Sequence, residues 1–388
     1  MKKIKRVIAV TGIRSEYDIL YPVIKRLNER DDIELKIVVA GAHLSDWHGN
    51  TIESIRHDGF VIADRIDTLF STNRTTQRSK AVGQLITGLT QTVEREQPDL
   101  LIVVGDREES IATAVVGNYM EVLVAHIGGG DPVWGNADDP IRMAVSKLAH
   151  IHFTTAKPYS DNLLKMGEDD WRVTFSGTPG LDNIKHEPEL DIGQVSKFIG
   201  TELDNFIVVL KHPLSSEHES AYEQMKATLT AIDSVCRAKN MKAICITPNS
   251  DPGSLDIVKA YKEFESDYIL LKSTLPRHIF INLLRKAKAL VGNSSMGILE
   301  APMYKLPVVN VGHRQRGRLN AGNVKFVSYK VEEIVEAIEQ AVFEPTYRHF
   351  VAQLDNPYGT GNAAEIIETY LSQIDLDNPK WAVKSKLI

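Results

Sequence analysis

The chain has 388 residues and a formal net charge of −6 at pH 7, with 43% hydrophobic and 25% charged residues. This length exceeds what a single hydrophobic core usually supports, so two domains are expected. The acidic balance argues against general binding to nucleic acid or to a membrane surface, since both favour a basic patch. Basic residues that gather locally could still bind a small anionic molecule.

The N-terminal sequence MKKIKRVIAVTGIR places lysines before an apolar run, as a signal peptide does. The run is only about five residues long, against roughly 7–15 in a signal peptide, so it predicts a first buried strand. No stretch approaches the ~20 apolar residues that cross a bilayer. Cys236 and Cys245 fit neither a disulfide framework nor a zinc spacing, which favours a reduced, cytoplasmic location.

Short apolar runs then alternate with amphipathic helical stretches. The first such stretch, residues 15–30, has a helical stripe made of Ile19, Leu20, Val23, Ile24 and Leu27. The apolar runs lie at residues 5–12, 33–41, 99–106, 123–129 and 150–156 in the first half, and at 205–213, 242–248, 268–272, 288–295 and 306–312 in the second. Because they are continuous rather than alternating, they predict parallel strands buried on both faces between helices.

A segment rich in Gly, Pro and charge, residues 176–190, separates the two series of strands. The expected fold is therefore α/β, with two Rossmann-like, doubly wound domains over residues 1–183 and 184–357. If the two face each other, their strand C-termini surround a central cleft, and ligands of such sheets bind beyond those ends.

The best candidate for an anion site is VGNSSMGILEAP, residues 291–302. A strand that runs into Asn293, Ser294 and Ser295 at a helix start offers free N–H groups and the positive end of the helix dipole to a phosphate. Glu300 follows in the early turns, where its carboxylate could accept hydrogen bonds from ribose hydroxyls. The alternative makes Ser294 a helix N-cap and Glu300 a solvated acid.

Arginines follow the next strand, in VGHRQRGR at residues 311–318. Arg314, Arg316 and Arg318 suit a diphosphate, because the planar guanidinium binds two oxygens at once. Solvation at the surface is the alternative for each of them. Arg14, in the first strand-to-helix turn with Ser15 as the helix cap, is a second anion contact from the other domain.

The sequence lacks the glycine patterns of two common nucleotide-binding classes. It has no GxGxxG after the first strand and no GxxxxGK[ST], which argues against a dinucleotide oxidoreductase and a P-loop NTPase. His150 and His152 lie on one face of a strand without an evident third ligand, so they are expected to pack or to cap rather than to bind a metal.

The remaining polar residues at strand ends are acids and histidines, namely Asp106, Asp131, Asp138, Asp139, His126 and His212. Opposite a diphosphate site, such residues fit chemistry on a sugar attached to a nucleoside diphosphate. The diphosphate leaves with its charge neutralised, while an acid or an imidazole moves protons on the sugar.

Six segments, taken in order, resemble the hydrolysing UDP-N-acetylglucosamine 2-epimerases of sialic acid pathways: TGIRSEYDILYPVIKRL, GDREE, HIGGGD…DDPIR, LKHP, GNSSMGILEAP and RQRGR. The resemblance covers nearly the whole chain. It implies a fold similar to glycosyltransferase-B, in which a C-terminal helix crosses back onto the first domain. Residues 359–374 are placed to form that helix, so residues 358–388 are expected to complete the first domain.

The resemblance also implies a reaction in two steps. UDP is eliminated across C1–C2 of the sugar to give a glycal, and water then adds with inversion at C2, which releases N-acetylmannosamine and UDP. Asp106 resembles an acid/base residue, Asp138 or Asp139 with Arg142 a second acidic position, and His212 a histidine near the leaving group. The substrate-binding candidates are Arg14, His43, Arg107, Asn293, Ser294, Ser295, Glu300, Arg314 and Arg318.

Gly128 departs from the family pattern, because it stands where a glutamate follows His-Ile in other members. Asp131 could supply the missing carboxylate, Asp106 and His212 could carry more of the proton transfer, or the substrate could differ. We favour Asp131, since three glycines let the backbone approach the sugar and bring this aspartate round. The alternative for Asp131 is a turn-capping role before Pro132.

The sequence thus predicts a metal-independent, cofactor-free hydrolysing 2-epimerase that acts on UDP-N-acetylglucosamine or a close UDP-2-acetamido sugar. The expected partners are the UDP-sugar and further copies of the chain in a dimer or tetramer, with no nucleic acid and no membrane. The alternatives are a non-hydrolysing epimerase, a glycosyltransferase of the same architecture, and a sugar-nucleotide-binding regulator without turnover.

Overall fold

The computed structural model describes residues 4–70, 76–132, 138–248 and 251–384. Contacts between residues divide the chain into two compact units. Unit 1 contains Met1–Pro132, Ala137–Lys185 and Tyr358–Ile388, so the chain returns to it near its C-terminal end. Unit 2 contains His186–Pro357.

Unit 1 is built on a parallel sheet of seven strands in the order β3-β2-β1-β4-β5-β6-β7. The chain first adds strands on one side of β1 and then continues from β4 on the other side. The strands are β1 (Lys5–Thr11), β2 (Ile33–Ala40), β3 (Ile62–Ile66), β4 (Leu100–Val104), β5 (Leu123–Ile127), β6 (Ile151–Thr154) and β7 (Val173–Phe175).

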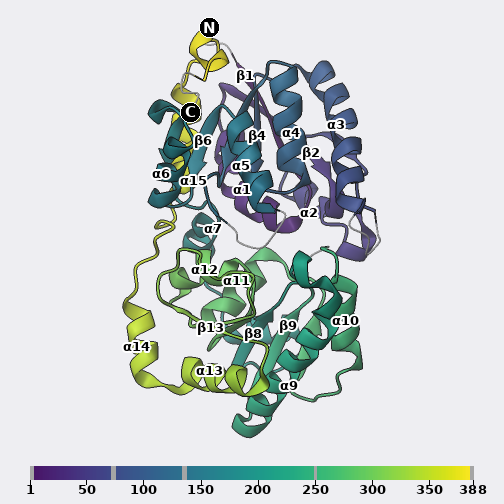
Figure 1. The fold of residues 1–388 in the computed structure, drawn as a ribbon, viewed down its shortest axis with the longest axis vertical. Helices are drawn as coiled ribbons and strands as arrows, with labels where there is room; N and C mark the ends of the chain where they lie inside the picture. Colours follow the sequence, from purple (N-terminus) through teal and green to yellow (C-terminus); the bar gives the residue numbers. More distant parts are fainter. Residues whose placement is uncertain (1–3, 71–75, 133–137, 249–250, 385–388) are drawn as a thin grey trace. The chain divides into compact units, whose positions relative to one another are not determined.

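Helices cover both faces of this sheet (Figure 1). In β1, Val7 and Ala9 pack with one set of helices and Ile8 and Val10 with the other, because alternate residues of a strand point to opposite faces. The first set is α1 (Arg14–Asn28), α2 (Ile52–His57) and α15 (Ala363–Gln373); the second is α3 (Thr76–Glu96), α4 (Glu108–Tyr119) and α5 (Asp138–Leu148). The remaining helices are α6 (Lys157–Lys165) and α7 (Gly180–His186).

Unit 2 repeats this plan with a parallel six-stranded sheet in the order β10-β9-β8-β11-β12-β13. Its strands are β8 (Phe206–Leu210), β9 (Lys242–Ile246), β10 (Ile269–Lys272), β11 (Leu290–Gly292), β12 (Val308–Val311) and β13 (Val324–Val327). Its helices are α8 (Ile192–Ile199), α9 (Ala221–Lys239), α10 (Ser254–Glu263), α11 (Arg277–Lys286), α12 (Met296–Leu299), α13 (Val331–Phe343) and α14 (Pro345–Gln353). Cys236 and Cys245 are both buried free thiols in its core.

Short 3₁₀ turns connect these elements, at Gly41–Leu44, Asp46–His48, Asp170–Arg172, Ser215–Ser220, Ala301–Tyr304 and Pro379–Ala382. In the described part of the chain, no helix combines the length and apolar character that a bilayer span requires.

The predicted fold class is confirmed, including the C-terminal helix that returns to the first domain. Ala364, Ile367 and Leu371 of α15 are buried in the same core as α1. The prediction that Ser15 caps the first helix is wrong. The helix already begins at Arg14, its N-cap residue is Ile13, and the Glu16 carboxylate accepts the Gly12 N–H at 3.0 Å instead.

Candidate functional site

Each sheet has one point where the strand order reverses, between β1 and β4 in unit 1 and between β8 and β11 in unit 2. Ligands of doubly wound sheets bind beyond the carboxyl ends of the strands at such points. The loops that follow these four strands begin at Gly12, Gly105, Lys211 and Asn293. Most of the residues singled out from the sequence lie on these loops or on elements next to them.

In unit 1, the Arg142 side chain brings three candidate residues together. From α5 it donates to the carbonyl of Gly128 at 2.8 Å, to the carboxylate of Asp106, and lies 3.5 Å from Asp131 Oδ2. Asp131 is 1% exposed and Arg142 9% exposed. Two carboxylates from different loops therefore share one largely buried guanidinium.

The three glycines after β5 explain how Asp131 reaches this guanidinium. Gly128 and Gly130 have φ of +86° and +75°, a region that favours glycine. A Cβ at Gly130 would collide with the Tyr159 carbonyl of α6, and one at Gly129 would lie 2.9 Å from Ser146 Oγ of α5. The turn thus packs directly against two helices and carries Asp131 back toward Arg142.

His126, near the end of β5, contacts the loop after β4 and the helix α5. Its Nε2 lies 2.7 Å from the Gly105 carbonyl oxygen and its Nδ1 3.4 Å from Ser146 Oγ. Burial lowers the pKa of this imidazole to about 3, so the ring is neutral at pH 7. Nε2–H then donates to the Gly105 carbonyl, and Nδ1 carries no proton.

Asp138 and Asp139 are the first two residues of α5, one turn before Arg142. The side chain of Asp138 lies outside the described part of the structure. Asp139 is half-buried at the N-terminal end of the helix, where the helix dipole favours a carboxylate.

The predicted binding residues of unit 1 lie on the neighbouring loops. His43 is buried, with Nε2 3.0 Å from Thr11 Oγ1 and Nδ1 2.7 Å from Thr51 Oγ1, and burial lowers its pKa to about 4. Arg14 Nε lies 3.4 Å from Asp18, and Arg107 Nε 3.7 Å from Glu108.

In unit 2, Asn293 joins the ends of two adjacent strands. Its side chain accepts the His212 N–H at 2.7 Å and donates to the His212 carbonyl at 2.8 Å. Its own carbonyl accepts from Arg314 Nη1 and Gln315 Nε2, both at 3.1 Å, and Arg318 donates to Gln315 Oε1 at 2.8 Å. Four candidate residues therefore belong to one hydrogen-bonded group.

The helix after Asn293 is shorter than expected, with a single turn at Met296–Leu299. This changes the surroundings of Ser294, Ser295 and Glu300. Glu300 closes that turn instead of lying early in a longer helix. The helix stops there because Pro302 has no N–H to continue it. One turn carries less macrodipole than a longer helix, so the contribution expected from the helix dipole is smaller, and phosphate binding by the N–H groups of this turn stays a prediction. Ser294 Oγ lies 3.4 Å from the Met296 N–H, a weak cap.

Lys211 is a residue that sequence reasoning missed, although its segment LKHP was noted for His212. Its side chain is 1% exposed and its ammonium lies 4.9 Å from the centre of the Tyr329 ring. Burial lowers its pKa to about 8. A lysine at the end of a buried apolar strand was the available signal, since such a residue is rarely buried without a role.

Glu16 and Glu109 were also missed. Both are 6% exposed, and both converge on Gly12, which donates to Glu16 Oε2 and has no room for a Cβ beside the Glu109 carboxyl. Glu16 Oε1 and Glu109 Oε2 are buried without a hydrogen-bond partner. Burial first, and the neighbouring acids second, raise the pKa of Glu109 to about 7 and that of Glu16 well above its usual value.

Within the described residues, no group of three or more His, Cys, Asp or Glu side chains is arranged to hold a metal ion. His150 Nδ1 accepts the Val124 N–H at 3.1 Å, and His152 Nε2 lies 3.1 Å from Glu168 Oε2. Both histidines therefore have protein partners.

Glu109→Gln should stabilise the protein at pH 8. Because the pKa of Glu109 is raised from 4.5 to about 7, its contribution to stability is fully present below pH 4.5 and is lost as the pH rises through 7. A neutral amide avoids this loss. The variant should therefore have a higher thermal unfolding midpoint at pH 8, equivalent to about 1–3 kcal/mol, and a weaker pH dependence between pH 5 and 8.

The matched control for this measurement is Glu94→Gln, at an exposed position of α3, which should leave the midpoint nearly unchanged at both ends of the pH range. A midpoint that falls at pH 8 in Glu109→Gln would show that the charged carboxylate is stabilising, contrary to this account.

Comparison with known sequences gives a consistent family. The family model described as UDP-N-acetylglucosamine 2-epimerase matches residues 25–372. A Legionella pneumophila protein named UDP-N,N'-diacetylbacillosamine 2-epimerase (hydrolyzing) is 33% identical over 376 residues, which cover 96% of this chain and 97% of that protein. A UDP-N-acetylglucosamine 2-epimerase of Neisseria meningitidis serogroup B is 29% identical over 98% of both chains.

Solved structures share the fold. The crystal structure of UDP-GlcNAc 2-epimerase from Neisseria meningitidis bound to UDP-GlcNAc matches with a TM-score of 0.79 and 22% identity, and it covers 95% of this chain and 100% of that one. The family model spans most of the chain, and the Legionella relative extends over nearly all of it. The chain therefore belongs to the UDP-N-acetylglucosamine 2-epimerase family.

Proposed function

We propose that the protein is a hydrolysing 2-epimerase that converts a UDP-2-acetamido sugar into the free 2-epimer sugar and UDP. The observation that carries this proposal is the pair of carboxylates, Asp106 and Asp131, which both contact the Arg142 guanidinium from the loops that follow β4 and β5. Proton removal from one face of C2 and proton delivery to the other require two such groups.

The reaction is written in two steps. A base takes the proton from C2 while the C1–O bond to the diphosphate breaks, which gives UDP and a sugar with a C1=C2 double bond. Water then adds across that bond, its hydroxyl to C1 and a proton to the opposite face of C2. Since the C2 proton is weakly acidic, the base must be well positioned and the leaving diphosphate well stabilised.

In this proposal Asp106 and Asp131 exchange protons with the sugar, and Asp131 replaces the glutamate missing at Gly128. Arg142 holds both carboxylates in position. Asp138 and Asp139, at the start of the helix that carries Arg142, are the further acidic candidates. His212 assists at the leaving group.

The Asn293 group of unit 2 is the proposed nucleotide side. Arg314 and Arg318 offer guanidinium groups to the diphosphate, and Lys211 adds a buried cation at the end of the adjacent strand. Ser294, Ser295 and Glu300 are the proposed hydroxyl and ribose contacts, through backbone and side-chain groups rather than through a helix dipole. Arg14, Arg107 and His43 are the proposed contacts from unit 1.

Two sugars are the leading substrates. UDP-N-acetylglucosamine is the substrate in the name of the Neisseria relative, and UDP-N,N'-diacetylbacillosamine in that of the Legionella relative, which has the higher identity of the two. Both names specify epimerisation at C2, which requires a proton on that carbon. The product proposed for the first sugar is N-acetylmannosamine.

Turnover in heavy water tests the function. With UDP-N-acetylglucosamine and UDP-N,N'-diacetylbacillosamine offered separately, NMR should detect free UDP and a free 2-epimer sugar with deuterium at C2 for one of them. A product that stays attached to the nucleotide would indicate a non-hydrolysing epimerase. A requirement for an acceptor would indicate a glycosyltransferase, and stabilisation by the UDP-sugar without turnover would indicate a regulator.

Asp106→Asn and Asp131→Asn should each lower kcat by about 10²–10⁴-fold, because an amide cannot exchange the proton. The affinity for UDP, measured by calorimetry, should stay close to that of the parent protein in both variants, since neither aspartate is among the proposed nucleotide contacts. Near-normal turnover in either variant would remove that residue from the proposed mechanism.

Arg314→Ala should weaken UDP binding by about tenfold or more, because a charged hydrogen-bond donor to the diphosphate is lost. Arg237→Ala is the control, since Arg237 is an exposed arginine of α9 in the same unit and is not among the diphosphate candidates. Equal Kd values for UDP in the two variants would contradict the assignment of Arg314 to the nucleotide.

A further inference from the structure

The chain after α15 returns along unit 1 and is held there by a buried arginine. Arg172 is 0% exposed. Its guanidinium donates to the His150 carbonyl at 3.1 Å and to the carbonyls of Lys380, Trp381 and Val383 at 3.0, 3.3 and 2.7 Å. We refer to residues 375–384 as the C-terminal strap.

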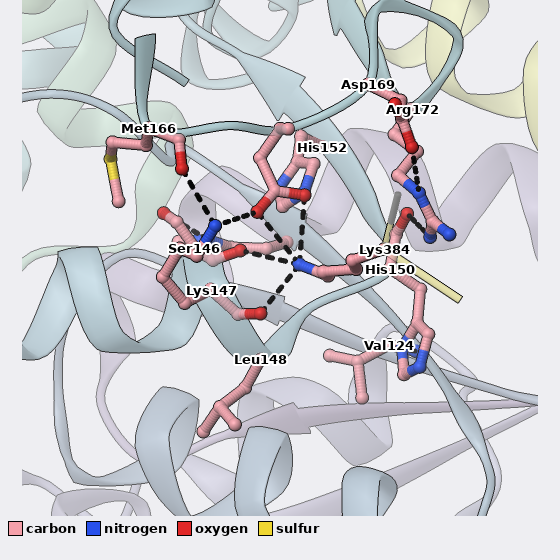
Figure 2. Close-up of polar contacts among 12 residues, drawn as sticks. Val124, Ser146, Lys147, Leu148, His150, His152, Met166, Asp169, Arg172 and Lys384 are labelled. Atoms are coloured by element: carbon pink, nitrogen blue, oxygen red, sulfur yellow. Dashed lines mark hydrogen bonds and ion pairs between the residues drawn. The ribbon is translucent and has the colours of Figure 1, made fainter. Parts of the chain in front are cut away.

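A second cation, supplied by the strap itself, enters unit 1 (Figure 2). Lys384 Nζ donates to the carbonyls of Ser146 and Lys147 at 3.3 and 2.6 Å, and to the two carboxylate oxygens of Glu168 at 3.0 and 2.9 Å. The two carbonyls belong to the last turn of α5. Lys384 therefore caps this helix at the end where its carbonyls lack intrahelical partners.

Glu168 is fully buried and links the strap to the sheet. Lys147 Nζ lies 3.2 Å from Oε1, and His152 Nε2, from β6, 3.1 Å from Oε2. Burial alone would raise the pKa of Glu168, but the hydrogen bond with His152 and the Lys384 ammonium hold it at about 2. The carboxylate is thus charged at neutral pH and needs these partners.

The helix capped by Lys384 is the one that carries Arg142. Ser146 Oγ donates to the Arg142 carbonyl at 2.9 Å and lies 3.4 Å from His126 Nδ1, and His126 in turn contacts the Gly105 carbonyl beside Asp106. A shift of α5 along its axis would move Arg142 relative to both carboxylates. Interiors are close-packed, so such a shift is transmitted rather than absorbed.

A second lysine of unit 1 also caps the end of a helix, but a different helix. It therefore shows what a helix cap contributes when the helix does not carry Arg142. Lys5 donates to the carbonyls of Leu371, Ser372 and Ile374 at 2.9, 2.9 and 2.8 Å, and so caps the end of α15 in the same manner. In the described structure α15 carries none of the candidate site residues. The two lysines provide the same kind of contact, and only one of them provides it to the helix of Arg142.

We propose that the C-terminal strap positions α5, and that Lys384 is a positioning residue for Arg142 and the two carboxylates around it. This inference rests on the proposed function, because it assumes that Asp106, Asp131 and Arg142 act on the sugar. The strap also connects residues 375–384 to the candidate site, although they lie far from it in sequence.

Lys384→Met tests the proposal in the full-length protein, with Lys5→Met as the matched control. Both variants should lower the thermal unfolding midpoint by a few degrees, since each removes one helix cap. Only Lys384→Met should lower kcat, by about tenfold or more as the reacting groups shift. KM for the UDP-sugar and Kd for UDP should stay unchanged in both. An unchanged kcat in Lys384→Met, or an equal loss in Lys5→Met, would overturn the proposal.

In Lys384→Met the Glu168 carboxylate loses a cationic partner, and the protein could fail to fold for that reason alone. A second variant covers this case. Glu168→Gln/Lys384→Met removes both charges but still lacks the cap on α5, so its kcat should remain low. Recovery of the parent kcat would show that Lys384 only neutralises Glu168, which contradicts a positioning role.

Hydrogen exchange separates failure of this proposal from failure of the proposed function. Amides of α5 should exchange faster in Lys384→Met and those of α15 faster in Lys5→Met. If the parent protein turns over neither UDP-sugar, the proposed function fails, and exchange in α5 still tests the strap. If the amides of α5 exchange at the parent rate in Lys384→Met, the proposal that the strap positions α5 is wrong, even where turnover is normal.

Discussion

The arrangement of the loops in unit 1 depends on which groups accept hydrogen bonds from the Arg142 guanidinium. Arg142 is largely buried, and its acceptors are the carboxylates of Asp106 and Asp131 and the carbonyl of Gly128. A buried charge is tolerated only when it is paired and hydrogen-bonded. The loops after β4 and β5 must therefore end close to α5. The left-handed turn through Gly128 and Gly130, and the neutral His126 beneath it, provide the geometry that this requires.

The sheet that supports this arrangement was predictable because its central strands are buried on both faces. β1, β2, β4 and β5, and β8, β9, β11 and β12 in unit 2, are continuous apolar runs, and all of them were identified from the sequence. β3, β7 and β13 were not identified. Each is an edge strand with mostly half-buried residues and no continuous apolar run, whereas the edge strand β10 has the run Ile269–Leu271 and was identified. Pairing with one neighbour, rather than composition, makes these segments strands.

The candidate site was predictable to the extent that strand ends mark it. Asp106, Asp131, His212, Asn293 and Arg314 follow strands, and their polar character after an apolar run is visible in the sequence. Contacts made over long sequence separations are not visible in this way. Glu109 was quoted as part of a motif, but only the fold brings it against Gly12. The extent of α12 depended on Pro302, whose effect on the preceding turn was overlooked.

The buried acids of unit 1 differ in what they contribute to the stability of the fold. Glu168 has charged or hydrogen-bonding partners on each oxygen. Glu16 and Glu109 each leave one buried oxygen without a partner, which destabilises the folded state. Groups that destabilise a fold and lie at the end of a central strand are typical of functional sites rather than of structural networks. Glu168 therefore belongs to a satisfied network that links β6, α5 and residue 384, whereas the two acids around Gly12 have no comparable network among the described residues.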